Sequence, residues 1–246
     1  MIPIISKNLM TADQHLVHYD LYAAGHDRLV IIAPGFFNSK QALLLKDLAR
    51  SLNDDYDAAI LDFRGHGKSQ GWFCWTSKEY LDLLALIEGV KKDYRKIGLI
   101  GFSLGAATSL IAASKTDHVD SIIAVSAPAE FERIEYYFWQ LDPRLDIHYS
   151  LLSEGRIGKG VKPGPFWLPK EKPRQVVKSL TRPVFYLHGT EDWLIKPWHS
   201  ELLHRETSSR IKKFEIIEGW PHAEYMIRTH PDIFFNKVKG WFKETL

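Results

Sequence analysis

The hydrophobic positions of this chain fall into short apolar runs that alternate with longer amphipathic stretches. The apolar runs are typical of buried strands and lie at 29–33, 58–61, 97–100, 121–125, 183–187 and 212–217. The amphipathic stretches are typical of helices and lie at 40–52, 77–94, 106–113, 198–205 and 231–243. Such alternation favours an α/β fold, in which a mostly parallel central sheet, preceded here by two short N-terminal strands, carries helices on both faces.

Within the predicted helix 77–94, four residues share one helical face: Leu81, Leu84, Ala85 and Glu88. Because three of them are apolar, we expect a buried stripe with a polar edge. This helix is therefore assigned to packing and not to a functional site.

Residues 131–180 depart from the alternation. This stretch is rich in aromatic residues, contains a segment rich in Gly and Pro, and separates two predicted strands of the sheet. At 246 residues the chain has an ordinary length for one α/β domain. We therefore expect a single domain over 1–246 with an insertion at about 131–180.

The sequence Gly101-Phe102-Ser103-Leu104-Gly105 connects the apolar run 97–100 to the small-residue stretch 106–113. This is the context of a nucleophile elbow, a sharp turn between a strand and a helix that lifts a serine clear of the sheet. The turn strains the serine backbone, and glycines two residues to either side avoid collisions with the neighbouring elements. Ser103 is the candidate nucleophile.

A serine hydroxyl needs a base and an acid to become a nucleophile, and both follow in the chain. Asp192 ends a Gly-containing loop after the run 183–187, and His222 ends another loop after 212–217. Neighbouring Glu191 competes for the role of the acid, but side chains of adjacent residues point in different directions, so only one can reach the imidazole. His66 and His188 are the nearest rivals of His222 as the base.

With Ser103, Asp192 and His222 in this order, the chain resembles the α/β-hydrolase family along nearly its whole length. The resemblance implies the α/β-hydrolase fold, a cap formed by the insertion, and backbone roles for His66 and His188 in their loops. It also implies that the N–H groups of Phe36 and Leu104 form an oxyanion hole. One departure is that Pro34-Gly35 stands where the family often has His-Gly, so the hydrogen bonds that brace this loop must differ.

These residues predict a serine hydrolase that cleaves a small-molecule carboxylic ester through an acyl-enzyme, with neither a cofactor nor a metal ion. Aromatic side chains near the predicted site suggest an apolar pocket for small to medium substrates and are listed here as candidate substrate contacts: Phe37, Trp139, Trp193 and Trp220. A serine at the elbow argues against relatives that cleave halides or epoxides, since those reactions need a carboxylate nucleophile.

Several alternatives stay open. The same triad would serve an aminopeptidase or amidase, a thioesterase or an acyltransferase, and a protein of this fold that has lost its chemistry would be a binding protein. An aminopeptidase needs a carboxylate in the pocket to hold the substrate's ammonium group. Three glutamates around the start of the insertion could supply it: Glu130, Glu132 and Glu135.

Composition narrows the partners and the compartment. A net charge of +2, with 32 basic residues spread among 30 acidic ones, gives no reason to expect a nucleic-acid partner. Cys74 is the only cysteine, so no disulfide forms within the chain. The first residues lack the pattern of a signal peptide, and no apolar run reaches membrane-spanning length. We expect a cytoplasmic protein, and the sequence leaves its oligomeric state open.

Overall fold

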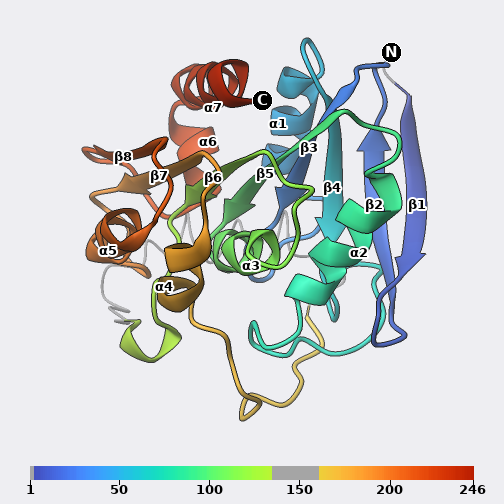
Figure 1. Ribbon diagram of the computed structural model, residues 1–246, viewed down its shortest axis with the longest axis horizontal. Helices are drawn as coiled ribbons and strands as arrows, with labels where there is room; N and C mark the ends of the chain where they lie inside the picture. Colours follow the sequence, from blue (N-terminus) through green and yellow to red (C-terminus); the bar gives the residue numbers. More distant parts are fainter. Residues whose placement is uncertain (1–2, 135–160) are drawn as a thin grey trace.

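The computed structural model describes residues 3–134 and 161–246. Eight strands form one sheet in the order β1-β2-β4-β3-β5-β6-β7-β8, shown in Figure 1. The strands are β1 (Ile4–Met10), β2 (Leu16–Tyr22), β3 (Arg28–Ala33), β4 (Asp57–Asp62), β5 (Lys96–Phe102), β6 (Ser121–Val125), β7 (Val184–Gly189) and β8 (Lys212–Ile217). The hairpin β1–β2 is antiparallel and β2 pairs antiparallel with β4, whereas all other neighbouring strands are parallel. The predicted sheet is confirmed.

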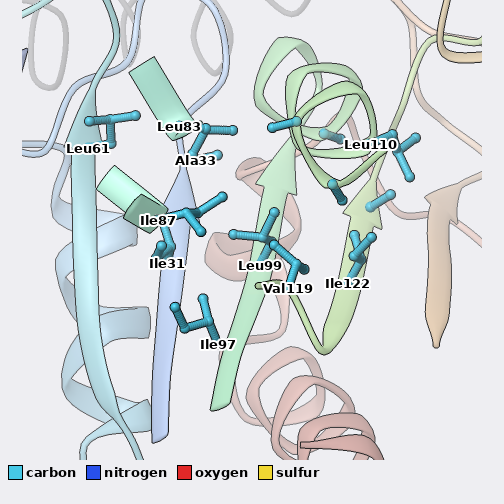
Figure 2. Close-up of a cluster of buried hydrophobic side chains, with 14 of the residues drawn as sticks. Ile31, Ala33, Leu61, Leu83, Ile87, Ile97, Leu99, Leu110, Val119 and Ile122 are labelled. Carbon is cyan, nitrogen blue, oxygen red and sulfur yellow. The ribbon is translucent and has the colours of Figure 1, made fainter. Parts of the chain in front are cut away.

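Helices cover both faces of the sheet. On one face, α2 (Tyr80–Val90), α3 (Leu104–Ala113) and α5 (Trp198–Glu206) contribute to a buried apolar cluster. On the other, α1 (Leu43–Leu52), α6 (Tyr225–Thr229) and α7 (Pro231–Thr245) form a second cluster with the alternate strand residues. Figure 2 shows part of the first cluster, where Leu99 and Ile122 of neighbouring strands lie beside Leu110 of α3. Burial on both faces explains why the central strands are continuous apolar runs.

The helix predicted at 77–94 is shorter and buries a different face than expected. Helix α2 buries Asp82, Leu83, Leu86, Ile87 and Val90, whereas Leu81, Leu84 and Ala85 are only partly buried and Glu88 is exposed. Asp82 is buried because it accepts hydrogen bonds from the Arg64 side chain at 2.7 and 2.9 Å and from the Arg64 backbone N–H at 2.8 Å. The predicted stripe was therefore wrong, because the ion pair with Arg64 places Asp82 on the buried face of the helix.

Residues 161–168 of the predicted insertion lie against the loop that precedes α2. A 3-10 turn, η1 (Phe131–Arg133), follows β6, and β-bridges join His66 to Val161 and Phe73 to Pro163. Helix α4 (Pro173–Val176), which packs against α3 and α5, and a 3-10 turn, η5 (Val177–Ser179), then lead into β7. The cap itself stays a prediction, since 135–160 lie outside the described residues. Among the described helices, none combines the length and apolar character needed to cross a bilayer.

Candidate active site

Ser103 lies on the turn between β5 and α3, at the carboxyl edge of the sheet. Its backbone has φ 49° and ψ −112°, and residues other than glycine rarely adopt such a positive φ. Its N–H donates to the Val125 carbonyl at 2.9 Å, which ties the turn to the end of β6. Backbone strain of this kind persists only where the surroundings enforce it, as at a nucleophile elbow.

The two glycines of the turn are required by close backbone approaches. A Cβ on Gly101 would lie 2.4 Å from the Gly105 carbonyl oxygen, and a Cβ on Gly105 would lie 2.1 Å from the Ala33 carbonyl oxygen. These distances are far below van der Waals contact, so neither position tolerates a side chain. The glycine spacing seen in the sequence is thus explained by packing of α3 against β3 and β5.

Asp192 and His222 meet where β7 and β8 end. The Nδ1 atom of His222 lies 2.8 Å from each carboxylate oxygen of Asp192, whose side chain is fully buried. Glu191 is exposed, and its backbone N–H donates to the Trp220 carbonyl at 3.0 Å. The structure therefore brings Asp192, and not Glu191, to the imidazole.

Asp192 accepts further hydrogen bonds that hold it as an anion. Burial alone would raise the pKa of Asp192, but the nearby imidazole of His222 and hydrogen bonds from His188 and His222 outweigh it and hold that pKa well below its usual range. The N–H groups of Leu194 and Ile195 also donate to its Oδ1, at 3.1 and 2.8 Å. This carboxylate is fixed in place and can orient a histidine.

The rival histidines occupy other positions. His188 is fully buried, with Nε2 2.7 Å from the Ile195 carbonyl and 3.2 Å from Asp192 Oδ2, so it supports the acid from behind. His66 is buried with Nδ1 3.1 Å from the Arg64 carbonyl, and burial lowers its pKa to about 4. Its ring packs edge-on to Phe36 and Phe73. The other nitrogen of His188, Nδ1, lies 2.7 Å from Ser200 Oγ, so both of its ring nitrogens are engaged, and the Nδ1 of His66 is held by a backbone carbonyl and not by a carboxylate.

Leu104 and Phe36 carry the two predicted oxyanion N–H groups. Leu104 is the first residue of α3, where N–H groups lack partners within the helix, and Phe36 follows the end of β3. Within the described ranges, no hydrogen-bond acceptor faces either N–H. Both residues line the same pocket as Ser103. Two free donors beside a strained serine suit an oxyanion hole.

The pocket at Ser103 has a volume of about 270 Å³ and is mainly apolar. Its described lining consists of Phe36, Phe73, Trp75, Thr76, Ser103, Leu104, Pro128, Phe131, Ile134, Lys170, Leu194 and Ile195. Lys170 is the one charged residue in this part of the lining, and its Nζ donates to the Phe166 carbonyl at 2.5 Å.

Sequence reasoning missed the aromatic wall of this pocket. The ring of Phe73 stacks on Phe36 with centroids 4.9 Å apart and contacts Trp75 at 5.0 Å. The indole N–H of Trp75 donates to the Gly164 carbonyl at 3.1 Å, which holds that ring beside the later loop. The run Trp72-Phe73-Cys74-Trp75 was a visible signal, because three aromatic residues between the predicted strand 58–61 and the predicted helix 77–94 need a surface to cover.

The predicted substrate contacts differ from this lining. Phe37 is exposed and packs on the outer side of Phe36 at 4.0 Å, and Trp193 lies 6.3 Å from the His222 ring, but neither lines the described pocket. Trp220 is buried in the apolar cluster of α6 and α7 and stacks on His230 at 5.5 Å, and it does not line the described pocket. Trp139 lies outside the described residues.

The described ranges hold no candidate metal site. No group of three or more His, Cys, Asp or Glu side chains there has the geometry to hold an ion. The carboxylates and imidazoles near Ser103 instead bond one another or backbone N–H groups.

Comparisons with known proteins give one family and many structures. The family model of the alpha/beta hydrolase fold matches residues 28–145. An esterase from Pyrococcus furiosus superposes with a TM-score of 0.80 at 21% identity, over 99% of this chain and 93% of that one. An esterase from Rhodococcus sp. gives 0.74 at 18%, over 97% and 98%. A bromoperoxidase from Bacillus anthracis gives 0.73 at 19%, over 96% and 100%.

Proposed function

Because the chain has the α/β-hydrolase fold, we propose that it is a serine hydrolase that cleaves carboxylic esters with small to medium apolar groups. The fold, predicted from the sequence, is confirmed by the family match and the structural neighbours. The observation that carries the proposal is the strained Ser103 at the elbow together with the buried contact, at 2.8 Å, between His222 and Asp192. Esterases among the neighbours support the same class of reaction.

In the proposed mechanism, Ser103 Oγ attacks the ester carbonyl carbon and gives its proton to Nε2 of His222. Asp192 keeps Nδ1 of His222 protonated, so that the lone pair of Nε2 takes the serine proton, and it stabilises the imidazolium. The N–H groups of Phe36 and Leu104 donate to the developing oxyanion. His222 then protonates the leaving alcohol, and a water activated by the same histidine cleaves the acyl-enzyme.

The size and character of the pocket support the substrate class. Pockets for drug-sized ligands usually hold about 300 to 1,000 Å³, so a volume of about 270 Å³ favours a smaller acyl or alcohol group. The walls are aromatic and aliphatic, and each buried methylene of substrate contributes about 0.8 kcal/mol. The value of kcat/KM should rise with each added carbon until the pocket is filled.

The ion pairs of the candidate glutamates argue against the aminopeptidase alternative. Glu130 pairs with Arg174 at 2.8 Å and Glu132 pairs with Lys172 at 3.1 Å, and neither lines the described pocket. Glu135 lies outside the described residues. The cation Lys170 in the lining would repel an ammonium group.

The remaining alternatives use the same triad and are distinguished by products. A thioesterase, an acyltransferase or an amidase would need no change at Ser103, His222 or Asp192, and the bromoperoxidase among the neighbours illustrates that the fold alone does not fix the reaction. No observation favours any of them over ester hydrolysis. A binding protein would have no use for a buried acid that is hydrogen-bonded to a histidine.

A substrate series tests the proposal. p-Nitrophenyl esters from acetate to palmitate are compared with amino-acid arylamides at equal concentration, with Ser103→Ala as the blank. We expect a rate maximum among the short and middle esters, and loss of that rate in Ser103→Ala by about 10⁴-fold or more. Faster cleavage of arylamides would replace the proposed substrate class, and turnover unchanged by Ser103→Ala would remove the mechanism.

A further inference from the structure

Glu224 is a buried carboxyl group beside the proposed oxyanion hole that the mechanism above does not use. It lies two residues after His222, and only 4% of its surface is exposed. Its Oε1 accepts a hydrogen bond from the Gly35 N–H at 2.6 Å, across 189 positions of the sequence. The bond thus joins the loop of the base to the loop that carries Phe36.

Gly35 allows this contact by having no side chain. A Cβ on Gly35 would lie 2.7 Å from Glu224 Oε1 and 3.1 Å from Oε2, too close for the carboxyl group to stay where it is. The φ of Gly35 is not positive, so glycine is needed here for space and not for backbone conformation.

The peptide between Pro34 and Gly35 is held from both sides. The Pro34 carbonyl oxygen approaches the elbow helix so closely that a Cβ on Gly105 would lie 2.5 Å from it. In a trans peptide the C=O and the N–H point in opposite directions, so the N–H of Gly35 faces away from the elbow and toward Glu224. Fixing this peptide plane sets the direction of the chain into Phe36, whose N–H is the next donor along.

The segment 222–224 is itself anchored at two points. His222 is held by Asp192, and the Ala223 N–H donates to Ser126 Oγ at 3.0 Å, at the end of β6. Ala223 has φ 47°, a strained value that these contacts maintain. Glu224 therefore extends from a rigid backbone segment and can hold the neighbouring loop in a fixed position.

We infer that Glu224 is a positioning residue that holds the Phe36 N–H in line for the oxyanion, in place of the bracing that His-Gly would give this loop. The inference rests on the proposed serine hydrolase function, since it assigns the acceptor that aligns one of its two oxyanion donors. Loss of the acceptor leaves the Gly35 N–H buried without a partner, which disfavours the observed loop and moves the donor.

Four variants test this role. Glu224→Met removes the acceptor at similar size, Glu224→Asp shortens its reach, and Glu224→Gln keeps an acceptor oxygen. Gly35→Ala displaces the carboxyl group although residue 224 is still Glu. Glu218→Met is the matched control, an exposed glutamate on the same loop.

The expected result is a selective loss of transition-state stabilisation. Glu224→Met, Glu224→Asp and Gly35→Ala should lower kcat on a p-nitrophenyl ester by about 10- to 100-fold, less than the 10²- to 10³-fold typical of losing an oxyanion donor outright. KM should stay within about threefold, and the inhibition constant of an alkylboronic acid, which forms a tetrahedral adduct on serine, should rise with the loss in kcat. Glu224→Gln and Glu218→Met should stay within about threefold of wild type.

The pH profile distinguishes positioning of the oxyanion loop from an effect on the base. The acid limb of kcat/KM should keep its position in Gly35→Ala and Glu224→Asp, because these variants keep the carboxyl group and leave His222 and Asp192 untouched. A shifted limb would mean that Glu224 acts through His222. A kcat within threefold of wild type in folded Glu224→Met, Glu224→Asp and Gly35→Ala would mean that the hydrogen bond to Gly35 does not position the Phe36 N–H. Either result overturns the inference. An inactive wild type that does not react at Ser103 would instead refute the proposed function.

If Glu224→Met fails to fold, the decision passes to Gly35→Ala and Glu224→Asp, which keep the carboxyl group. Thermal unfolding of each variant establishes which are folded. The same kinetic criteria then apply, with Glu224→Gln as the conservative rescue.

Discussion

Replacing Asp192 by Asn should abolish most of the activity without removing a single heavy atom from the site. The Leu194 and Ile195 N–H groups both donate to Oδ1, at 3.1 and 2.8 Å, so the amide oxygen of Asn would keep that position. The amide nitrogen would then replace Oδ2, which lies 2.8 Å from His222 Nδ1 and 3.2 Å from His188 Nε2. His222 Nδ1 also lies 2.8 Å from Oδ1, but that oxygen already accepts hydrogen bonds from two backbone N–H groups. An N–H donor would face both imidazoles.

The consequence is the wrong tautomer of the base. His222 can accept from the Asn amide only through a deprotonated Nδ1, which moves its proton to Nε2 and leaves no lone pair for the Ser103 hydroxyl. The same Asp-to-Asn change in the triad of a serine protease lowers kcat by about 10⁴-fold, which equals about 5 kcal/mol of activation free energy at about 1.36 kcal/mol per factor of ten. The buried anion that stabilises the imidazolium is lost as well.

Turnover of p-nitrophenyl butyrate by Asp192→Asn, Glu191→Gln and wild type measures the effect. We expect Glu191→Gln to stay near wild type, because Glu191 is exposed and contributes only its backbone N–H to the loop. Thermal unfolding shows whether Asp192→Asn is folded. A folded Asp192→Asn that retains more than about a tenth of wild-type kcat, or a crippled Glu191→Gln, would refute the reasoning.

Three further predictions concern the packing around the site. Burial lowers the pKa of His66 to about 4, so below about pH 6.5 the unfolded chain binds more protons than the folded protein, and the wild type loses stability as the pH falls. His66→Phe does not bind this proton, so between pH 7.5 and 5 its free energy of unfolding, measured with urea, should rise by about 2 kcal/mol relative to that of the wild type. A difference between the two proteins that does not change with pH would contradict this prediction. Gly105→Ala should not give a folded active enzyme, because its Cβ would lie 2.1 Å from the Ala33 carbonyl oxygen, whereas Gly240→Ala, with nothing within 4 Å, should raise stability by about 0.5 to 1 kcal/mol; equal melting temperatures would argue against the packing account. Trp75→Ala removes part of the pocket wall and should move the rate maximum in the ester series toward longer chains, and an unchanged maximum would show that Trp75 does not limit the pocket.

The fold was predictable because the sheet is buried on both faces. Strands such as β6 and β8 have the predicted bounds, since apolar runs flanked by turn residues leave little choice of state. The buried face of α2 was not predictable. Its sequence is apolar almost all round, so periodicity cannot choose a face, and the ion pair that buries Asp82 comes from Arg64 on another loop.

The candidate site was predictable only in part, for a related reason. Ser103, Asp192 and His222 each follow a strand, and parallel strands bring their carboxyl ends to one edge, so local patterns place all three at the same edge of the sheet. The pocket wall comes from side-chain directions that local patterns do not fix. Trp220 precedes the base by two residues and yet packs with α6 and α7, whereas Phe73, far away in the sequence, faces Phe36.

Glu224 illustrates the same limit. Nothing in the sequence links it to Gly35, and the missing His-Gly pair indicated only that some other group must brace the loop. The acceptor became visible once the structure placed the loops after β3 and β8 side by side.

Covalent labelling of Ser103 tests the central claim most directly. A fluorophosphonate reacts rapidly only with a serine that is activated by a base and faces an oxyanion hole. Folded wild-type protein should gain the mass of one adduct, peptide mass spectrometry should locate it on Ser103, and Ser103→Ala and His222→Ala should gain none at the same exposure. No adduct on folded protein, or an adduct on another serine, would contradict the account.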